Sequence, residues 1–542
     1  MFFSILKPTL SDSCAARLGR LSVPGRNAVS TPNFIALTSR GAIPHLTPDV
    51  LQRHVQPPGA YLALEDFVEK SHKTTPPILQ IPSSSSSNIS PLHAFTSLPS
   101  PTLMILSPRR AAAVKPPQGN LKSGMSIFTS TGFQSLTSPA YVSSISKIRP
   151  DIVIPLADLT YSNHSPVAKR QARMAERTED WLEEFLSEFP THASLAKGRT
   201  KIFAPVLPID HPMQWEYLNR LSDADGFLPQ VSGLALNDVD ILPEIHTSYP
   251  DLTPLPVLSV AAAGAPTPHH LLRQVSLGVD LLTVPFLNAV SDSGVGMTFV
   301  FPPPSTKSDP SAAIVMTQSQ PEETPGKTTG SQQDDAAFPD PITGLLPLGT
   351  NLWSPTHRLS PLPILLSCAC YTCKNHSRAY LHHLLNAREM LAWVLLQIHN
   401  HHVLTTFFSS IRDVLSSSTA AAWEEACKDF ARGYEAEFPI GTGERPRARG
   451  YHFKSQGGDK PINKKQWDYE LKAGPDGEAP MEENTAVVDD QRGNGGETML
   501  VDRTVSETPV VPDPNMDARD LDERGVGFAE SMATAEKKAG AG

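Results

Sequence analysis

Cysteine, aromatic residues and long apolar runs are all scarce in this chain. Only five of its 542 residues are cysteine, and aromatic residues make up 7% of the sequence. No run of about eighteen apolar residues occurs, so no membrane-spanning helix is predicted. The N-terminal segment is interrupted by Lys7 and Pro8 too early to form the apolar core of a secretory signal. We therefore expect a cytoplasmic protein; the early arginines make a mitochondrial leader the less favoured alternative.

Most of the net negative charge lies in the C-terminal tail. Residues 451–542 contain 11 Lys and Arg against 19 Asp and Glu, a net charge of −8, whereas the whole chain carries −10. The preceding part is thus nearly neutral. This does not exclude a nucleic-acid partner, because a binding surface needs only a local basic patch. Proline is abundant at 52 residues, which indicates that part of the chain is not packed into a core.

From residue 126 to 285 short apolar runs alternate with amphipathic stretches, and two separate apolar runs precede this part. The expected strands are Phe34–Leu37, Leu103–Leu106, Ser126–Phe128, Asp151–Ala157, Ile202–Leu207, Gly226–Leu234, Leu255–Ala262 and Gly278–Pro285. The expected helices are Ser138–Ile148, Ala168–Glu188, Met213–Leu221 and Pro268–Val275. Repeated strand–helix units predict an α/β fold with a (β/α)₈ TIM-type barrel, and a doubly wound open sheet is the main alternative.

Composition divides the chain into four parts. Residues 1–302 are expected to form the first part of the barrel, with a Ser- and Pro-rich surface loop at 74–120. Residues 303–340 have few large apolar side chains and are expected to be a disordered insertion. Residues 341–440 are expected to complete the barrel and to form a C-terminal zinc-binding subdomain with helices. Residues 441–542 are expected to be a disordered acidic tail.

Three of the five cysteines lie within six positions, at Cys368, Cys370 and Cys373. Three thiolates and one imidazole complete the tetrahedral shell that structural Zn²⁺ prefers. The following residues carry apolar side chains at three- and four-residue steps, which predicts one continuous helix over 377–399 with His399 at its C-terminal end. A disulfide is disfavoured because a C-x-C pair is poorly placed for a relaxed one. Buried thiols without a metal are the other alternative.

The residues alone leave the fourth ligand open, because five further histidines lie nearby: His376, His382, His383, His401 and His402. Cys368–Leu385 followed by Leu396–Asn400 resembles the zinc signature of tRNA-guanine transglycosylases, C-x-C-x₂-C with a histidine 26 positions after the last cysteine. In this sequence that histidine is His399. The resemblance covers about 22–440 without the insertions. It implies an irregular (β/α)₈ barrel with one structural Zn²⁺ per subunit.

The family exchanges guanine at the wobble position of tRNA for a modified base, which in eukaryotes is queuine in tRNAs with GUN anticodons. One aspartate attacks the ribose, and a second handles the protons. At the matching positions this chain has Thr283, which ends G-V-D-L-L-T, and Thr129, which opens T-S-T-G-F-Q. A threonine hydroxyl without an activating base is a poor nucleophile and does not replace a carboxylate. The resemblance therefore implies no catalytic residue in this chain.

Two further segments match the family's base pocket. Asp158 aligns with a base-recognising aspartate, and Ser232–Leu236 resembles a G-G-L-A-V loop. These matches preserve either a remnant of the pocket or only the packing of the barrel, and packing is the favoured interpretation.

The zinc signature without the two carboxylates resembles the non-catalytic subunits of eukaryotic members of the family. The implied role is to pair with the catalytic subunit as a heterodimer, through the zinc region and neighbouring helices, and to support tRNA binding. One alternative is an active transglycosylase with a displaced carboxylate such as Asp280 or Asp292. The other is a zinc-stapled barrel that acts as a scaffold or binds queuine without contacting tRNA.

Overall fold

The structure is a computed structural model that describes residues 2–11, 14–68, 75–82, 89–111, 113–116, 119–129, 132–160, 165–192, 200–260, 266–304 and 344–441. All of these residues belong to one compact unit, Met1–Glu470. The insertion expected at 303–340 and the tail expected at 441–542 lie outside the described residues, except for 303–304 and 441.

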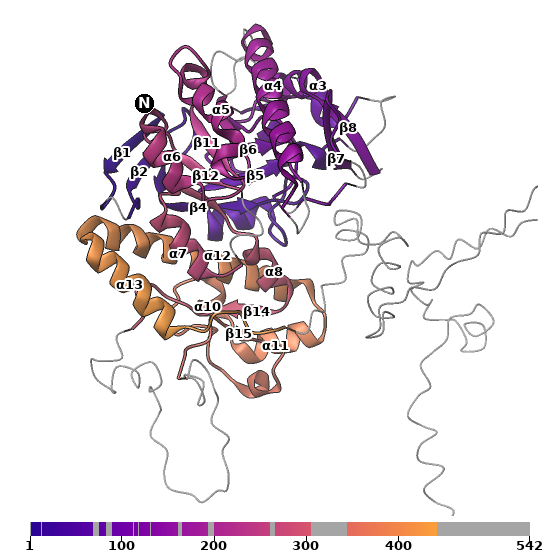
Figure 1. Ribbon diagram of the computed structural model, residues 1–542. Helices are drawn as coiled ribbons and strands as arrows, with labels where there is room; N and C mark the ends of the chain where they lie inside the picture. The colour runs from indigo at the N-terminus through magenta and orange to yellow at the C-terminus, as the bar shows by residue number, and fades with distance from the viewer. Residues whose placement is uncertain are drawn as a thin grey trace, which may run out of the picture. The chain divides into compact units, whose positions relative to one another are not determined.

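Eight parallel strands close into a barrel (Figure 1). In order around the ring they are β4 (Asn33–Leu37), β5 (Gly59–Ala63), β6 (Leu103–Ser107), β9 (Ile152–Val153), β10 (Lys201–Val206), β11 (Gly233–Leu236), β12 (Val257–Ser259) and β13 (Leu281–Thr283). The ring closes where β13 pairs with β4, with Leu281 opposite Asn33. This closure confirms the predicted barrel and excludes the open sheet, whose two edge strands lack such a neighbour.

Helices follow most strands and surround the barrel (Figure 1). They are α1 (Pro48–Val50), continued by a π-helix at Leu51–Val55, then α2 (Pro91–Thr96), α3 (Ser138–Ile148), α4 (Ala168–His192), α5 (His211–Ser222), α6 (Leu242–Ser248), α7 (Pro268–Ser276) and α8 (Phe286–Asp292). Short 3₁₀ turns lie at Leu64–Asp66, Pro77–Gln80, Leu228–Gln230, Pro250–Leu252 and Pro355–Leu359. No helix of the described ranges has both the length and the apolar character needed to cross a bilayer.

Several of the expected strands differ from the structure; the strand expected at Asp151–Ala157, for example, is only Ile152–Val153. Ser126–Phe128 belongs to β7 (Gly124–Thr129), which pairs antiparallel with β8 (Gly132–Thr137) in a hairpin outside the barrel ring. The strand expected from Gly226 begins only at Gly233, because a 3₁₀ turn precedes it. Pro229 in that turn has no N–H to donate to a central strand. The segment 74–120 contains the barrel strand β6 as well as α2.

Three N-terminal strands form an antiparallel sheet: β1 (Phe3–Lys7), β2 (Leu18–Leu21) and β3 (Val29–Thr31). Two buried ion pairs join this segment to residues that directly precede barrel strands. Arg17 contacts Asp280, before β13, at 2.6 Å, and Arg26 contacts Asp151, before β9, at 2.9 Å. Each aspartate also accepts a backbone N–H, from β12 or from β6, at 2.9 Å. The N-terminal segment is therefore fixed at the end of the barrel where the strands begin.

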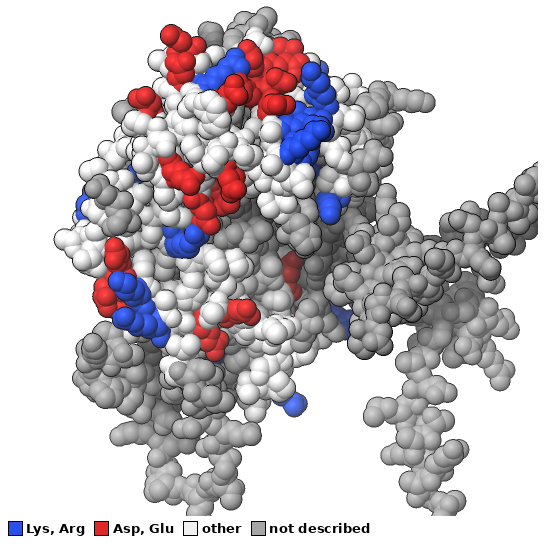
Figure 2. Space-filling model, in the orientation of Figure 1, with Lys and Arg blue, Asp and Glu red and all other residues white. Residues whose placement is uncertain are grey.

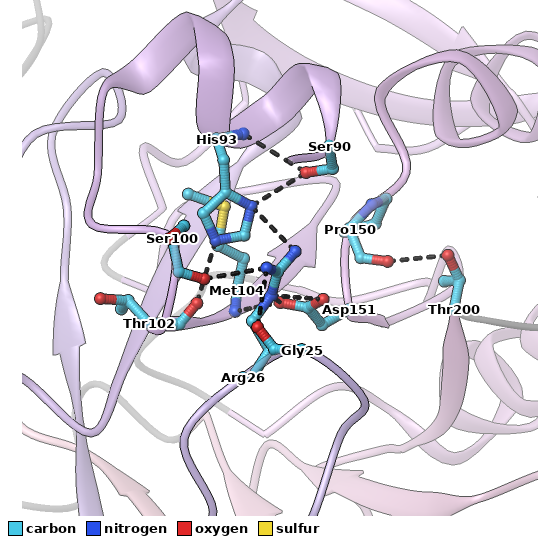
Figure 3. Close-up of polar contacts among 10 residues, drawn as sticks. All are labelled: Gly25, Arg26, Ser90, His93, Ser100, Thr102, Met104, Pro150, Asp151 and Thr200. Carbon is cyan, nitrogen blue, oxygen red and sulfur yellow. Dashed lines mark hydrogen bonds and ion pairs between the residues drawn. The ribbon is translucent and has the colours of Figure 1, made fainter. Parts of the chain in front are cut away.

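The pair of Arg26 and Asp151 lies in a wider polar network (Figure 3). Nε2 of His93 lies 3.0 Å from the carbonyl oxygen of Thr102, while Nδ1 faces both the Arg26 guanidinium at 3.2 Å and the Ser90 hydroxyl at 2.9 Å. This geometry assigns the ring proton to Nε2 and makes Nδ1 the acceptor. His93 in α2 thus joins the β2–β3 turn to the start of β6, and Arg26 extends the network to the start of β9.

The C-terminal region contains α10 (Tyr371–Asn375), α11 (Arg378–Asn386), α12 (Met390–Ser417), α13 (Ala420–Gly433) and the strand pair β14 (Val295–Met297) and β15 (Gly349–Asn351). The single helix expected over 377–399 is wrong. The chain breaks between α11 and α12, where Arg388 has a φ of 57° and the N–H of Glu389 returns to the carbonyl of Leu384. α12 then continues past 403, so His399 lies inside a helix and not at its end.

Candidate metal centre and barrel mouth

Cys368 and Cys370 lie on the loop that enters α10, and Cys373 lies in the helix itself. Cys370 is the N-cap of this helix, and its Sγ accepts the N–H of Cys373 at 3.3 Å. The Thr372 hydroxyl donates to the carbonyl of Leu395 at 2.7 Å, which attaches α10 to α12. The spacing C-x-C-x₂-C therefore brings three sulfur atoms to the part of α12 that carries His399.

The imidazole of His399 faces all three sulfurs. Its Nδ1 lies 3.7 Å from Sγ of Cys368, 3.6 Å from that of Cys370 and 3.3 Å from that of Cys373. The four donor atoms all lie within 4.8 Å of one another. In a tetrahedral zinc site, a sulfur and a nitrogen ligand are about 3.6 Å apart, given Zn–S and Zn–N bonds of roughly 2.3 and 2.0 Å. The group is therefore spaced to hold one metal ion.

A second contact orients this imidazole. Nε2 of the fully buried His399 lies 2.8 Å from the carbonyl oxygen of Met297 and donates its proton there, which leaves the Nδ1 lone pair directed at the sulfurs. Metal-binding histidines commonly have such a partner. The adjacent Asn400 accepts the N–H of Met297 at 2.8 Å and donates to the carbonyl of Val295 at 3.1 Å. His399 and Asn400 of α12 thus fix β14 beside the metal group, which is the set of Cys368, Cys370, Cys373 and His399.

The thiols do not titrate independently at this spacing. Contacts with Cys368 and Cys373 lower the pKa of the Cys370 thiol far below its usual value, and contacts with Cys368 and Cys370 raise that of Cys373. Burial lowers the pKa of His399, but the hydrogen bonds to Cys368 and Cys370 outweigh burial and raise it to about 9. Thiol and imidazole ligands bind a metal ion in their deprotonated forms, so metal binding at such a group depends on pH.

The other histidines of this stretch serve different surroundings. His382 bonds a backbone oxygen at 2.9 Å, and His376 stacks on Tyr380 with ring centroids 5.4 Å apart. His401 packs against Phe34, and burial lowers its pKa to about 3. In the described part of the chain, the structure brings His399 alone among the histidines to the three sulfurs. All five cysteines are thiols without a disulfide.

The two threonines that the resemblance matches to the family's aspartates, Thr129 and Thr283, are buried, each 1% exposed. Thr283 ends β13 and donates its hydroxyl proton to the carbonyl of Ser259 at 3.0 Å. Thr129 ends β7 and donates to the carbonyl of Gly132 at 2.9 Å. Each hydroxyl proton is therefore directed at the backbone and not at a base.

Asp158 is fully buried and held by three donors. Its Oδ1 accepts hydrogen bonds from Arg170 at 2.6 Å and from Asn120 at 2.8 Å, and its Oδ2 accepts one from Arg177 at 3.0 Å. Both carboxylate oxygens thus already have partners within the chain. Sequence reasoning missed this arrangement, although two arginines seven residues apart on the next helix are a usable signal, because such residues share one face.

The cavity at the barrel mouth is small, with a volume of about 40 Å³ and a lining that includes Tyr61, Ser107 and Asn237. This volume is room for a few water molecules. In the segment Ser232–Leu236, a Cβ on Gly233 would lie 2.5 Å from the ring of Phe203, so this glycine is required by close packing of neighbouring strands.

The carboxylates considered as displaced nucleophiles also have partners. Asp280 is bound by Arg17 at the start of β13, the end of the strand opposite to Thr283. Asp292 lies 2.6 Å from Nε2 of His45.

Comparison with known proteins gives a consistent result. The family model described as queuine tRNA-ribosyltransferase matches residues 12–435. The chain is 30% identical to the queuine tRNA-ribosyltransferase accessory subunit 2 of Schizosaccharomyces pombe, over 85% of this chain and 90% of the relative. Proteins of the same name match from Xenopus tropicalis (27% identity; 76% and 96% covered) and Drosophila virilis (24%; 75% and 88%). The chain therefore belongs to the queuine tRNA-ribosyltransferase family.

Proposed function

We propose that this chain is the non-catalytic subunit of a queuine tRNA-ribosyltransferase. That enzyme exchanges guanine for queuine at wobble position 34 of the GUN-anticodon tRNAs for Asp, Asn, His and Tyr. The observation that carries the proposal is the pair Thr129 and Thr283 at the family's aspartate positions, both buried and both bonded to backbone carbonyls. Neither hydroxyl is placed as an activated nucleophile. The shared name of the relatives, accessory subunit 2, supports the same role.

The remaining carboxylates near the barrel support this assignment against an active enzyme. Asp158 is neutralised by Arg170 and Arg177, and Asp280 lies at the far end of its strand from the barrel mouth. A nucleophilic carboxylate must be ionised and in line with the glycosidic bond. None of these residues meets both conditions.

The metal that we propose for the group of Cys368, Cys370, Cys373 and His399 is one structural Zn²⁺ per subunit. Three sulfurs and one imidazole nitrogen suit this ion, and four protein ligands leave no position for a substrate. The four residues would hold the cysteine loop, α10 and α12 together. The binding energy of the ion is then folding energy for this region.

The proposed partner is the catalytic subunit, bound as a heterodimer beside the metal group. Several exposed apolar or aromatic side chains occur in this part of the sequence: Leu359, Leu362, Leu366, Tyr371, Tyr380, Met390 and Leu391. The rings of Tyr371, His376 and Tyr380 follow one another at centroid distances of 5.7 and 5.4 Å. Exposed aromatic side chains of this kind are enriched at protein interfaces. The proposed location is the cytoplasm, where the mature tRNA substrate is used.

Incorporation of labelled queuine into a GUN-anticodon tRNA tests the function. The assay compares this chain alone, the catalytic subunit alone and the two together. We expect no incorporation by this chain alone and more incorporation by the pair than by the catalytic subunit. Incorporation by this chain alone would show that another carboxylate does the chemistry. A pair no more active than the catalytic subunit would favour the scaffold or queuine-binding alternative.

A further inference from the structure

The charges on α4 run against the helix dipole. The first ten residues, 168–177, contain Lys169, Arg170, Arg173 and Arg177 against one acid, whereas residues 178–192 contain five acids and no lysine or arginine. A helix favours acidic side chains at its N-terminus and basic ones at its C-terminus. Figure 2 shows both basic and acidic side chains over the region of α4 and α5, where Glu179 and Glu183 of α4 pair with Arg220 of α5. Helix stability does not explain this order of charges.

Two of the four cations have an internal role. Arg170 and Arg177 both bind Asp158, in the loop between β9 and α4. Since the mouth of a barrel is at the C-terminal ends of its strands, these pairs fix the first turns of α4 at the mouth. Because these pairs hold the first turns of α4 in place, they also fix the positions of Lys169 and Arg173 on this helix.

Lys169 and Arg173 remain exposed beside that attachment. Over the ranges that the structure describes, neither takes part in an ion pair with an acid. They are four residues apart, so they lie on one face as like charges, which further destabilises an isolated helix.

We propose that Lys169 and Arg173 form a surface that binds the phosphate backbone of tRNA at the rim of the barrel mouth. The proposal rests on the tRNA-supporting role proposed above and specifies its surface. The N-terminus of a helix carries a partial positive charge, so cations placed there repel it. A bound phosphate group would be attracted both by these cations and by the helix N-terminus, and would offset that repulsion. Because phosphate groups are the same in every tRNA, the surface is expected to contact tRNA independently of its sequence.

The test is equilibrium tRNA binding by the complex of the full chain with the catalytic subunit, at several salt concentrations. For Lys169→Gln/Arg173→Gln we expect about tenfold weaker binding near 0.15 M salt and a salt slope shallower by about 2. GUN and non-GUN tRNAs should be affected equally. The matched control is Lys428→Gln/Arg432→Gln, which removes two exposed charges at the same spacing from α13. It should leave both quantities unchanged.

Stability and rescue complete the design. Because the variant removes cations from a helix N-terminus, its Tm should not fall, and Lys169→Arg should bind tRNA like the wild type. Equal losses in the α4 variant and the α13 control would overturn the proposed surface. If the wild-type complex binds tRNA no better than the catalytic subunit alone, both the proposed surface and the proposed function are wrong. Weaker binding in the α4 variant alone supports both.

Discussion

The metal group and the barrel mouth are both built from buried polar side chains of distant segments, but they differ in where their donor atoms point. In the metal group, Nδ1 of His399 and three sulfurs face one another across less than 4.8 Å. At the mouth, both oxygens of Asp158 and the hydroxyl of Thr283 bond to groups of the chain itself. The first arrangement could hold a metal ion among its donors, whereas these groups at the mouth already have partners within the chain. Binding capacity is thus indicated by the direction of donor atoms, and not by polarity or burial alone.

Of the substitutions considered, His399→Ala should have the largest effect on stability, because it removes both a proposed metal ligand and the hydrogen bond to the carbonyl of Met297. A structural zinc site is worth about 10 kcal/mol or more in apparent binding energy. We therefore expect loss of the metal and unfolding of the region from α10 to α12 at 37 °C, measured by metal analysis and Tm. The exposed His383 provides the control: His383→Ala should retain one ion per chain. Undiminished metal content in His399→Ala would contradict the ligand assignment.

Removal of the metal by a chelator should destabilise the region around the metal group and leave the barrel unchanged. The residues beside the metal group have their own apolar cluster, which includes Leu381, Leu385 and Leu396 and is separate from the barrel core. Amide hydrogen exchange should therefore become at least about tenfold faster in α10 and α11, with little change in β10–β12. Uniform acceleration across the barrel would show that the two regions unfold as one.

Asp158→Ala should cost about 2–3 kcal/mol of unfolding free energy, because it leaves two arginines without their acceptor. The estimate is at the low end for a buried ion pair, since Arg170 and Arg177 are 22% and 17% exposed and water compensates in part. Urea denaturation measures the loss. Asp240→Ala, which removes an exposed pair with Arg273, should cost no more than about 1 kcal/mol. Unchanged stability with lost queuine incorporation would instead place Asp158 in contact with a ligand.

Thr283→Val should have the smallest effect, because valine retains the shape and loses one hydrogen bond worth about 1 kcal/mol. Incorporation of queuine by the heterodimer should stay within about twofold of the wild type. Much weaker incorporation at an unchanged Tm would mean that this hydroxyl acts in the reaction after all.

Features set by local sequence were predictable. The bounds of α3 follow from Thr137, whose hydroxyl accepts the N–H of Ala140, and from the left-handed Arg149 at its end. The strand–helix alternation predicted the barrel, because each unit carries its own apolar pattern. The cysteine spacing predicted three members of the metal group, and the family resemblance supplied His399.

Features set by distant partners were not predictable. The break at Arg388 was missed for a local reason, because the apolar periodicity continues on both sides of it. The partners of Asp158 and Asp280 are fixed by the closed barrel, and the arginine that binds Asp280 lies 263 positions away. A carboxylate in a sequence shows that a charge is present, but only the fold shows which cation neutralises it.

The ion pair of Arg17 and Asp280 also has a consequence for synthesis of the chain on the ribosome. At about 5–20 residues per second, roughly 13–50 s pass between translation of the arginine and of its partner. The interval between translation of β4 and of β13, the strand that pairs with it to close the ring, is nearly as long. During this interval the N-terminal sheet and the first barrel strand are outside the ribosome without their final contacts. The nascent chain therefore exposes an incomplete barrel edge, a surface for chaperones to protect, until almost 300 residues have been made.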